Sequence, residues 1–448
     1  MFSKKLKISL WNCKIRYVSL SAILLIALFL FCSCSSVSRL SFHESVVISS
    51  DYTGLVHAGW TGLQEEFTHL DYLGASWIIH TFYWRYIEPE QGEWDFTYYD
   101  EIVDNNIEAG IKVMGVLAYD NWWIHEDLSS HRYVPPHKLP DFLNYVKKTV
   151  EYFQGRVDAW CIWNEPNFHF WNGTNEEFFE LSRQAADAVR EVDSEVILLG
   201  GAFNRGVFGL PEKFIRGLFE SGAMEKVNAI AFHPYEMNPG RTARLYENFR
   251  KIVDDYGFGD KIWITEVGYP TGGFYPTKIR EKDLPEYVVK TSVFLTALGS
   301  KRLFWYQLFD PVERSNRNSE HFFGLTRSTE DYTSKGAEAF RLCAKYLSGT
   351  ICYVQEPRQD GLPKSLQVYW FKGTEESALV IWNEGAGSRQ VNLLLPGTNH
   401  LSHDIVSGKE SPIPAETAVK AGKMPLFITW KNPEIPGEDK PVIIQKKQ

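Results

Sequence analysis

Short apolar runs alternate with amphipathic stretches of helical period from about residue 54 to residue 348. Each apolar run predicts a strand, and each strand is followed by a predicted helix. The predicted strands are Leu55–Gly59, Ser76–His80, Ile111–Leu117, Val157–Trp163, Val196–Gly200, Ala229–Phe232, Lys261–Glu266 and Arg302–Tyr306. Eight strand–helix units in a row predict an α/β fold, a closed (β/α)8 TIM barrel over residues 51–348. An open doubly wound sheet is the alternative, but no G-x-G-x-x-G motif follows the first strand.

Several predicted helices have recognisable ends. Pro140 begins a helix with apolar residues at helical spacing, and Gly155 ends it. Thr174 and Glu177 have the spacing of a capping box. Pro211 and Pro285 mark the starts of two more helices.

After about residue 350 the apolar period changes from helical to two. Leu366, Val368 and Trp370 alternate with polar residues, and three further runs follow at 378–382, 391–395 and 426–430. This pattern predicts a small antiparallel β-sandwich domain over residues 349–432. The residues from 433 to 448 are polar and rich in proline, so we expect a loose tail.

The N-terminus has the composition of an export signal. A basic stretch precedes the apolar run Val18–Phe31, which is short for a membrane span. We therefore expect a signal peptide at 1–33 and a linker at 34–50. A small residue directly before Cys34 resembles a bacterial lipobox and predicts lipidation of Cys34 in the cell envelope. An ordinary signal peptide or an uncleaved anchor is the alternative, and each of these exports the protein.

Charge and cysteine content narrow the function further. Residues 1–33 contain five basic and no acidic residues, so their removal changes the net charge from −9 to −14. Such a charge argues against nucleic acid or an anionic membrane as ligand. Cys161 is expected to be a buried thiol, whereas Cys343 and Cys352 either pair or remain free. No C-x-x-C, H-x-H or H-E-x-x-H motif occurs, so we expect no metal and no cofactor.

Two of the predicted strands end in a glutamate. The fourth ends in Trp163-Asn164-Glu165-Pro166-Asn167, and the seventh ends in Thr265-Glu266. Side chains at these strand ends lie at the C-terminal mouth of a barrel, where active sites of this fold occur. A salt bridge to a loop arginine or lysine is the alternative for either glutamate alone. Two such glutamates favour a catalytic pair.

These motifs resemble clan A of the glycoside hydrolases, whose retaining enzymes have glutamates on barrel strands four and seven. Segments 83–90, 232–235 and 304–307 also resemble this clan, especially its families 39 and 5, and the predicted sandwich resembles the accessory domain of family 39. The resemblance implies a double displacement with Glu165 as acid/base and Glu266 as nucleophile. It also implies a raised pKa for Glu165 and an ionised Glu266.

The resemblance further implies a set of substrate contacts. Asn164 is expected to bind the sugar 2-hydroxyl, and Tyr235 or His233 to orient Glu266, although His233 is equally a candidate for a satisfied core histidine. Trp305 is expected to form the floor of the catalytic subsite. Further subsite candidates after the third strand are Tyr119, Asn121, Trp122 and Trp123.

One position departs from the clan pattern. Clan A members have an arginine near the end of strand two that braces the nucleophile, but this stretch reads Trp77-Ile78-Ile79-His80. His80 and Arg85 are the candidates to replace that arginine.

Three functions are consistent with these features. The first is a retaining glycoside hydrolase, acting as a monomer on an extracellular or cell-surface oligo- or polysaccharide. The second is a transglycosylase that uses the same two glutamates. The third is a glycan-binding surface lipoprotein without catalysis, against which the presence of both glutamates argues.

Overall fold

The computed structural model describes most of the chain beyond the N-terminal segment. The described residues are 45–57, 66–125, 132–206, 209–275, 278–311, 313–327, 333–354, 363–432 and, for the backbone, 443–446. The expected signal peptide and Cys34 lie outside these residues. Within them, no helix has the length and apolar character needed to cross a bilayer.

Eight parallel strands form a closed barrel, as the sequence predicts. They are β2 (Thr53–Val56), β3 (Trp77–Tyr83), β4 (Lys112–Ala118), β5 (Ala159–Ile162), β6 (Ile197–Asn204), β7 (Ala229–His233), β8 (Ile262–Val267) and β9 (Arg302–Trp305). The barrel strands four and seven are therefore β5 and β8. The apolar runs predict all eight because strands buried on both faces carry few polar residues.

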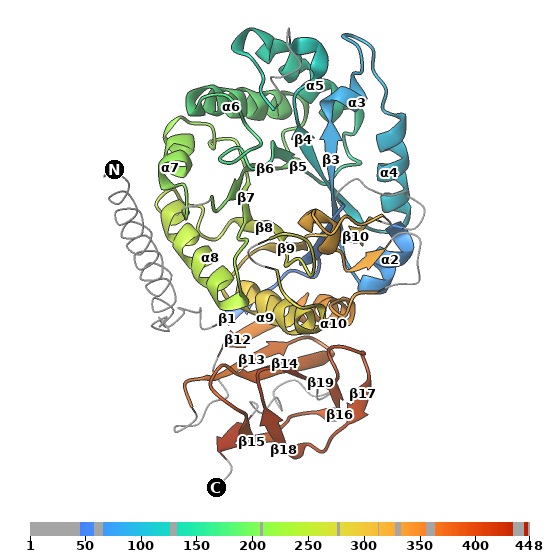
Figure 1. The fold of residues 1–448 in the computed structure, drawn as a ribbon, viewed down its shortest axis with the longest axis vertical. Coiled ribbons are helices and arrows are strands. Elements are labelled where there is room, and N and C mark those ends of the chain that lie inside the picture. The colour runs from blue at the N-terminus through green and yellow to red at the C-terminus, as the bar shows by residue number, and fades with distance from the viewer. Residues whose placement is uncertain are drawn as a thin grey trace, which may run out of the picture. The chain divides into compact units, whose positions relative to one another are not determined.

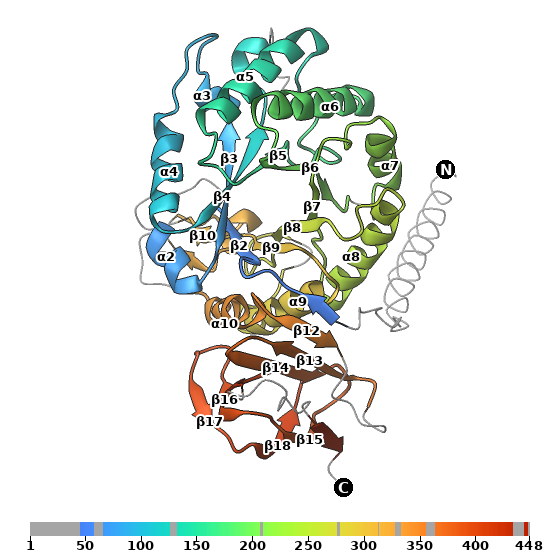
Figure 2. The same cartoon turned by 180° about the vertical axis from the view of Figure 1, so that it is seen from behind.

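Helices surround the barrel in a ring, which both views of the ribbon show (Figures 1 and 2). They are α2 (Glu66–Leu73), α3 (Trp84–Ile87), α4 (Thr97–Glu108), α5 (Leu139–Tyr152), α6 (Asn175–Val192), α7 (Glu212–Glu220), α8 (Pro239–Asp254), α9 (Leu284–Ala297) and α10 (Ala337–Leu347). The capping box predicted at Thr174 and Glu177 is present at the start of α6. Short 3₁₀ turns η2 (Trp122–Ile124), η3 (Pro136–Lys138), η4 (Glu281–Asp283) and η5 (Ser319–Phe322) interrupt the loops.

Aromatic side chains fill part of the barrel core. Trp77 lies with its ring centroid 5.5 Å from that of Trp263, and Phe304 stacks on Trp263 at 6.3 Å. A side chain at Gly54 would place its Cβ 2.4 Å from Phe304, so only glycine fits at this position of β2.

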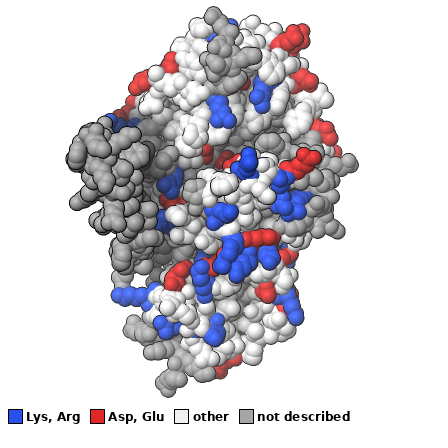
Figure 3. Space-filling view, viewed as in Figure 1, with Lys and Arg blue, Asp and Glu red and all other residues white. Residues whose placement is uncertain are grey.

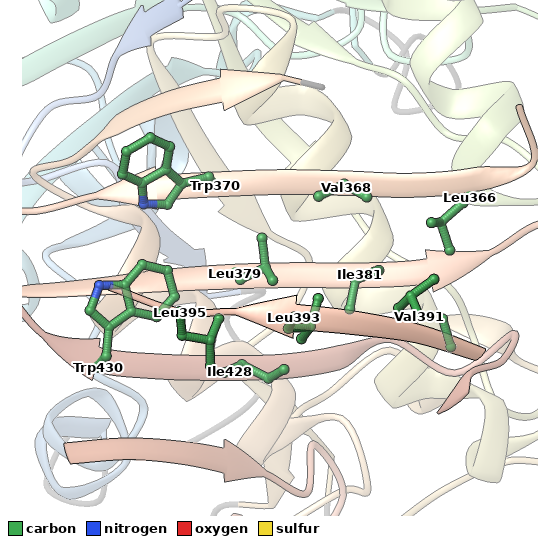
Figure 4. Close-up of a cluster of buried hydrophobic side chains, with 11 residues drawn as sticks. Leu366, Val368, Trp370, Leu379, Ile381, Val391, Leu393, Leu395, Ile428 and Trp430 are labelled. Atoms are coloured by element: carbon green, nitrogen blue, oxygen red, sulfur yellow. The ribbon is translucent and has the colours of Figure 1, made fainter. Parts of the chain in front are cut away.

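The C-terminal domain is a sandwich of two sheets, as predicted. The larger sheet has the order β1-β12-β13-β14-β19-β16-β17 and the smaller β18-β15-β20. Their strands are β1 (Ser45–Val47), β12 (Ile351–Val354), β13 (Leu366–Lys372), β14 (Glu376–Asn383), β15 (Arg389–Leu394), β16 (Thr398–His403), β17 (Glu410–Pro412), β18 (Glu416–Ala421), β19 (Leu426–Lys431) and β20 (Ile443–Lys446), while β10 (Phe309–Asp310) and β11 (Thr326–Arg327) pair separately. Side chains of alternate residues meet between the two sheets, with Trp370 and Trp430 among them (Figure 4).

The structure differs from the expected domain ends in two places. Ser45–Val47, within the expected linker, forms β1 and pairs antiparallel with Ile351–Tyr353 of β12. Ile443–Lys446, within the expected tail, forms β20 and pairs with β15. Both strands have only three or four residues, too few for a period of two to be recognised, and their partners supply the backbone hydrogen bonds.

The outer face of the larger sheet packs against α9 and α10. Phe294 of α9 contacts Trp382 at a centroid distance of 5.4 Å, and Tyr346 of α10 contacts Phe427 at 5.8 Å. Lys290 forms 3.0 Å ion pairs with Glu286 and with Glu384 of the sandwich. On the visible surface, basic and acidic side chains are intermixed (Figure 3).

The sequence leaves open whether Cys343 and Cys352 form a disulfide, and the structure answers this question. Cys343 and Cys352 are buried free thiols, as is Cys161. The thiol of Cys161 lies 3.7 Å from the carbonyl oxygen of Trp163.

Candidate active site

Glu165 occupies an unusual backbone conformation directly after β5. Trp163 has a φ of 64° and Glu165 a φ of 44°, both in the left-handed region that non-glycine residues rarely adopt. The amide of Glu165 donates to the carbonyl oxygen of Ala202, 3.1 Å away, and the buried indole of Trp163 donates to Phe170 at 2.7 Å. These contacts hold the turn that places the carboxylate of Glu165 at the barrel mouth, and strain of this kind is common at functional sites.

Glu266 lies at the corresponding end of β8. The register between β8 and β9 shifts between Ile264 and Val267, so an irregularity of the strand surrounds Glu266. The phenol of Tyr235 donates a hydrogen bond of 2.9 Å to Glu266 Oε2. The Glu266 side chain is 17% exposed, which leaves it accessible from the mouth.

His233 connects the two glutamates. Its Nδ1 lies 2.8 Å from Glu165 Oε1 and 3.5 Å from Glu266 Oε2, and its Nε2 lies 2.9 Å from the hydroxyl of Thr265. One oxygen of each glutamate and the histidine nitrogen all lie within 4.8 Å of one another. The structure therefore brings together the two carboxyl groups that the sequence separates by a hundred residues.

Burial and the neighbouring charge of Glu165 raise the pKa of Glu266 to about 7, against the opposing effects of His233 and Tyr235. Glu165 Oε1 lies within hydrogen-bonding distance of two nitrogens, His233 Nδ1 and Asn204 Nδ2, each 2.8 Å away. The Asn204 amide donates to Glu165, and Glu266 accepts the hydrogen bond from Tyr235. Glu266 therefore binds a proton near neutral pH, and carboxyl groups this close titrate as a pair.

Three residues at the site are absent from the sequence prediction. Asn204 reaches Glu165 because β6 has a register shift between Gly200 and Phe203. Tyr306 follows β9, with its ring centroid 6.3 Å from that of Tyr235, and its hydroxyl donates to Glu320 Oε2 at 2.8 Å. Burial raises the pKa of Glu320, a third carboxyl group near the pair. The one sequence signal for Asn204 is that it is the polar residue at the end of the apolar run of β6.

Asn164 and the loop after β4 are only partly as expected. The Asn164 amide donates to the Tyr119 hydroxyl at 3.0 Å, so these two residues lie together beside Glu165. The buried side chain of Asn121 and the indole of Trp123 instead donate to the carbonyl oxygen of Glu88. Trp122 is 46% exposed and donates to the carbonyl oxygen of Pro89, and no contact joins it to the glutamates.

Trp305 is not the floor of the site. Its side chain is 0% exposed and contacts Tyr269, whose hydroxyl bonds Thr242 of α8 and Thr291 of α9. Successive side chains of a strand point to opposite faces, so Trp305 packs against the helices while its neighbours face the barrel interior. The next residue, Tyr306, is partly exposed and lies beside Tyr235.

Neither candidate for the missing arginine reaches Glu266. The ring of His80 lies between the barrel and the helices, where its Nε2 is 3.1 Å from Glu66 Oε1. His57 and Asn106 also bond Glu66, which is fully buried. The guanidinium of Arg85 lies 4.8 Å above the ring of Tyr86. Within the described residues, Glu266 is therefore held by Tyr235 and His233 and not by an arginine.

Two groups of side chains have a spacing that a metal ion can use. One is His57, Glu66 and His80, and the other is Glu165, His233 and Glu266. Glu66 contacts both histidines of the first group, and His233 contacts both glutamates of the second.

Comparison with known sequences finds similarity to glycoside hydrolases over part of the chain. The glycoside hydrolase family 42 model, described as β-galactosidase, matches residues 61–125. A β-xylosidase of Caldicellulosiruptor saccharolyticus is 31% identical over 121 residues, 23% of this chain and 24% of that protein. The chain therefore aligns with about a quarter of that relative's length.

Similarity to solved structures covers more of the chain. A family 39 glycoside hydrolase from the gut symbiont Bacteroides cellulosilyticus WH2 superposes with a TM-score of 0.71 at 19% identity, over 86% of this chain and 81% of that one. A monomeric β-xylosidase from Caulobacter crescentus CB15 superposes with a TM-score of 0.62 at 13% identity, over 89% and 98%. The chain therefore shares the fold of these glycoside hydrolases, a TIM barrel with a β-sandwich.

Proposed function

We propose that this protein is a retaining glycoside hydrolase that cleaves O-glycosidic bonds of an extracellular or cell-surface polysaccharide. The observation that carries the proposal is the spacing of Glu165 and Glu266, which have carboxylate oxygens within 4.8 Å of one another. Retaining enzymes hold their carboxyl groups about 5–5.5 Å apart, whereas inverting enzymes need about 6.5–9.5 Å to admit a water molecule. The close spacing supports direct attack by one glutamate on the sugar.

The reaction proceeds by double displacement. Glu165, carrying the shared proton, protonates the glycosidic oxygen while Glu266 Oε attacks the anomeric carbon and the bond to the leaving group breaks. In the second step Glu165 removes a proton from water, whose oxygen displaces Glu266 from the anomeric carbon. The proton returns to Glu165, so the pair ends in its starting state.

The neighbouring residues support these roles. Tyr235 donates to Glu266 and so favours the ionised nucleophile. His233 contacts both glutamates and offers a route by which their shared proton can move to Glu165. Asn164 lies beside Glu165, where its side chain is suited to bind the sugar 2-hydroxyl.

The relatives suggest the first substrates to test. Two of the similar proteins are described as β-xylosidases, so β-xylosides come first. Export, lipidation at Cys34 and a monomeric state are part of this proposal, and their support is the N-terminal sequence and, for the monomer, the Caulobacter protein.

Rescue by an external nucleophile tests the proposal. Glu266→Ala should abolish hydrolysis of 4-nitrophenyl β-xyloside or another active aryl glycoside, and azide should restore turnover with an inverted glycosyl azide as product. Glu165→Ala should react with azide to give the retained product. An exchange of these two results would reverse the roles.

Product analysis of the wild type distinguishes a retaining hydrolase from the two alternative functions, a transglycosylase and a binding protein. NMR should show the retained anomer first, whereas immediate release of the inverted anomer would refute the mechanism. Transfer to added acceptor sugars in preference to water would identify a transglycosylase. Absence of any turnover in the polysaccharide and aryl glycoside panel, with glycan binding intact, would identify a binding protein.

A further inference from the structure

A hollow of about 600 Å³ lies beside the catalytic pair on the side of barrel strands two to four. Its lining includes Tyr83 and Arg85 after β3, Tyr119 after β4, and Arg132, His169 and Phe170 from later loops. We call this hollow the arginine pocket. It adjoins the active site because the hydroxyl of Tyr119 accepts the hydrogen bond from Asn164.

Both arginines of the pocket lie over aromatic rings. The guanidinium of Arg132 lies 4.2 Å from the centroid of Phe170, and one N–H donates to the carbonyl oxygen of His169 at 3.2 Å. The guanidinium of Arg85 lies 4.8 Å from the centroid of Tyr86 and 5.2 Å from that of Tyr83. Stacking restricts both side chains while leaving most of their N–H groups unused.

The positive charges of the pocket are not neutralised by the described part of the protein. Neither Arg85 nor Arg132 has an ion pair there, whereas Arg205 at the same mouth pairs with Glu236 at 2.7 Å. Asp120 also lines the pocket, but its Oδ2 lies 2.6 Å from Nε2 of His125. Among the described residues the lining thus holds two guanidinium groups and one carboxylate, and a concave site with this excess of positive charge is suited to an oxyanion.

We propose that the arginine pocket binds an acidic group on a sugar unit next to the bond that is cleaved, so that the substrate is an anionic glycan. A uronic acid carboxylate and a sulfate ester share the chemistry that two guanidinium groups recognise, since each is an anion whose terminal oxygens, two in the carboxylate and three in the sulfate ester, can accept from forked N–H donors. The stacked rings of Tyr119 and Phe170, at 5.7 Å, supply an apolar surface for the sugar ring. This inference rests on the proposed glycosidase function and specifies its substrate class.

Binding by a protein that cannot turn over separates the two proposals. Glu266→Gln in the full chain is titrated with glucuronoxylan oligosaccharides and with the same oligosaccharides after reduction of their carboxyl groups. A second arm uses oligosaccharides of a sulfated galactan before and after desulfation. We expect the acidic form of one pair to bind about tenfold or more tightly than its neutral form at low salt, with the preference decreasing as salt increases.

Variants of the two arginines test the assignment to this pocket. Arg85→Met with Arg132→Met should bring the acidic and neutral forms within about twofold, and Arg132→Lys should retain part of the preference. Arg183→Met, which removes an exposed arginine of α6, should retain all of it. Circular dichroism and thermal unfolding establish that each variant is folded, and Arg132→Lys tests the pocket if the double variant is not.

The possible outcomes either support the proposed anion-binding role of the arginine pocket or contradict it. A preference in the uronate arm or in the sulfate arm supports the pocket and identifies the acidic group. Equal affinity for acidic and neutral forms in both arms, or a preference that survives the double variant, overturns the inference. Failure of the wild type to hydrolyse any glycoside would instead refute the proposed function, because the binding measurement does not depend on turnover.

Discussion

The phenol of Tyr235 donates a hydrogen bond of 2.9 Å to Glu266 Oε2. At the end of the second barrel strand, where the sequence resemblance leads us to expect an arginine, β3 has the sequence Ile-Ile-His instead. A neutral phenol stabilises a carboxylate without adding a fixed positive charge. The site is therefore more sensitive to loss of this single bond than one that also contains an arginine.

Tyr235→Phe should lower kcat/KM by about 10- to 150-fold, because hydrogen bonds to charged groups contribute about 1.5–3 kcal/mol. The variant should also raise the pKa of the pair, since it removes a donor to ionised Glu266. Kinetics with an aryl glycoside at several pH values measure both effects. Tyr246→Phe is the control, because the buried hydroxyl of Tyr246 has no hydrogen-bond partner among the described residues. An equal effect of both variants would assign Tyr235 a merely structural role.

The activity should depend on the proton shared by Glu165 and Glu266. Burial and the charge of Glu165 raise the pKa of Glu266 to about 7, so the pair keeps its proton below that pH and loses it above. We expect kcat/KM to fall tenfold per pH unit above about pH 7. Glu165→Gln, assayed with an activated leaving group, should lose this alkaline limb. A profile that is flat from pH 6 to pH 9 in the wild type would contradict the shared proton.

Trp305 and Tyr306 should differ in what their substitution changes. Trp305→Phe reduces a fully buried side chain and should destabilise the fold by about 1–3 kcal/mol, with kcat/KM changed less than twofold. Tyr306→Phe removes the hydroxyl that bonds Glu320 and should lower kcat/KM with a smaller effect on unfolding. Urea unfolding and aryl glycoside kinetics measure the two effects. The reverse pattern would restore Trp305 as the floor of the site.

Glu66→Gln should destabilise the barrel by about 3–5 kcal/mol, because it leaves the donors of His57, His80 and Asn106 without their carboxylate. Burial acts to raise the pKa of Glu66, but the charges and hydrogen bonds of the two histidines outweigh it and hold the pKa well below its usual range. The stabilisation is therefore complete above the unfolded pKa near 4.5 and decreases as the pH falls below it.

Urea unfolding at pH 7 and at pH 4 tests this prediction, and the difference between wild type and Glu66→Gln should shrink at the lower pH. Glu180→Gln, at an exposed position of α6, is the control and should change stability by less than about 0.5 kcal/mol. Equal destabilisation by both substitutions would show that the buried cluster contributes nothing specific.

Much of the fold and the position of the candidate catalytic pair could be predicted from the sequence for physical reasons. The barrel strands are buried on both faces, so their apolar runs are visible without knowledge of their partners. Glu165 and Glu266 were recognised because each ends such a run. Asn204 could not be assigned, since its position depends on the irregular backbone at Gly201 and Ala202. Trp305 was misplaced because four consecutive large residues do not reveal which of them face the interior.

The pairing of β1 with β12 has a consequence for the order in which the protein folds. Ser45 pairs with Tyr353, so the partner of the first described strand is translated about 300 residues after it. At about 5–20 residues per second, β1 leaves the ribosome roughly 15–60 s before β12. During that time the whole barrel can form, and the larger sheet of the sandwich can close only after the barrel is complete. The pairing of β1 with β12 therefore forms late, and the final assembly of both domains follows the synthesis of the C-terminal strands.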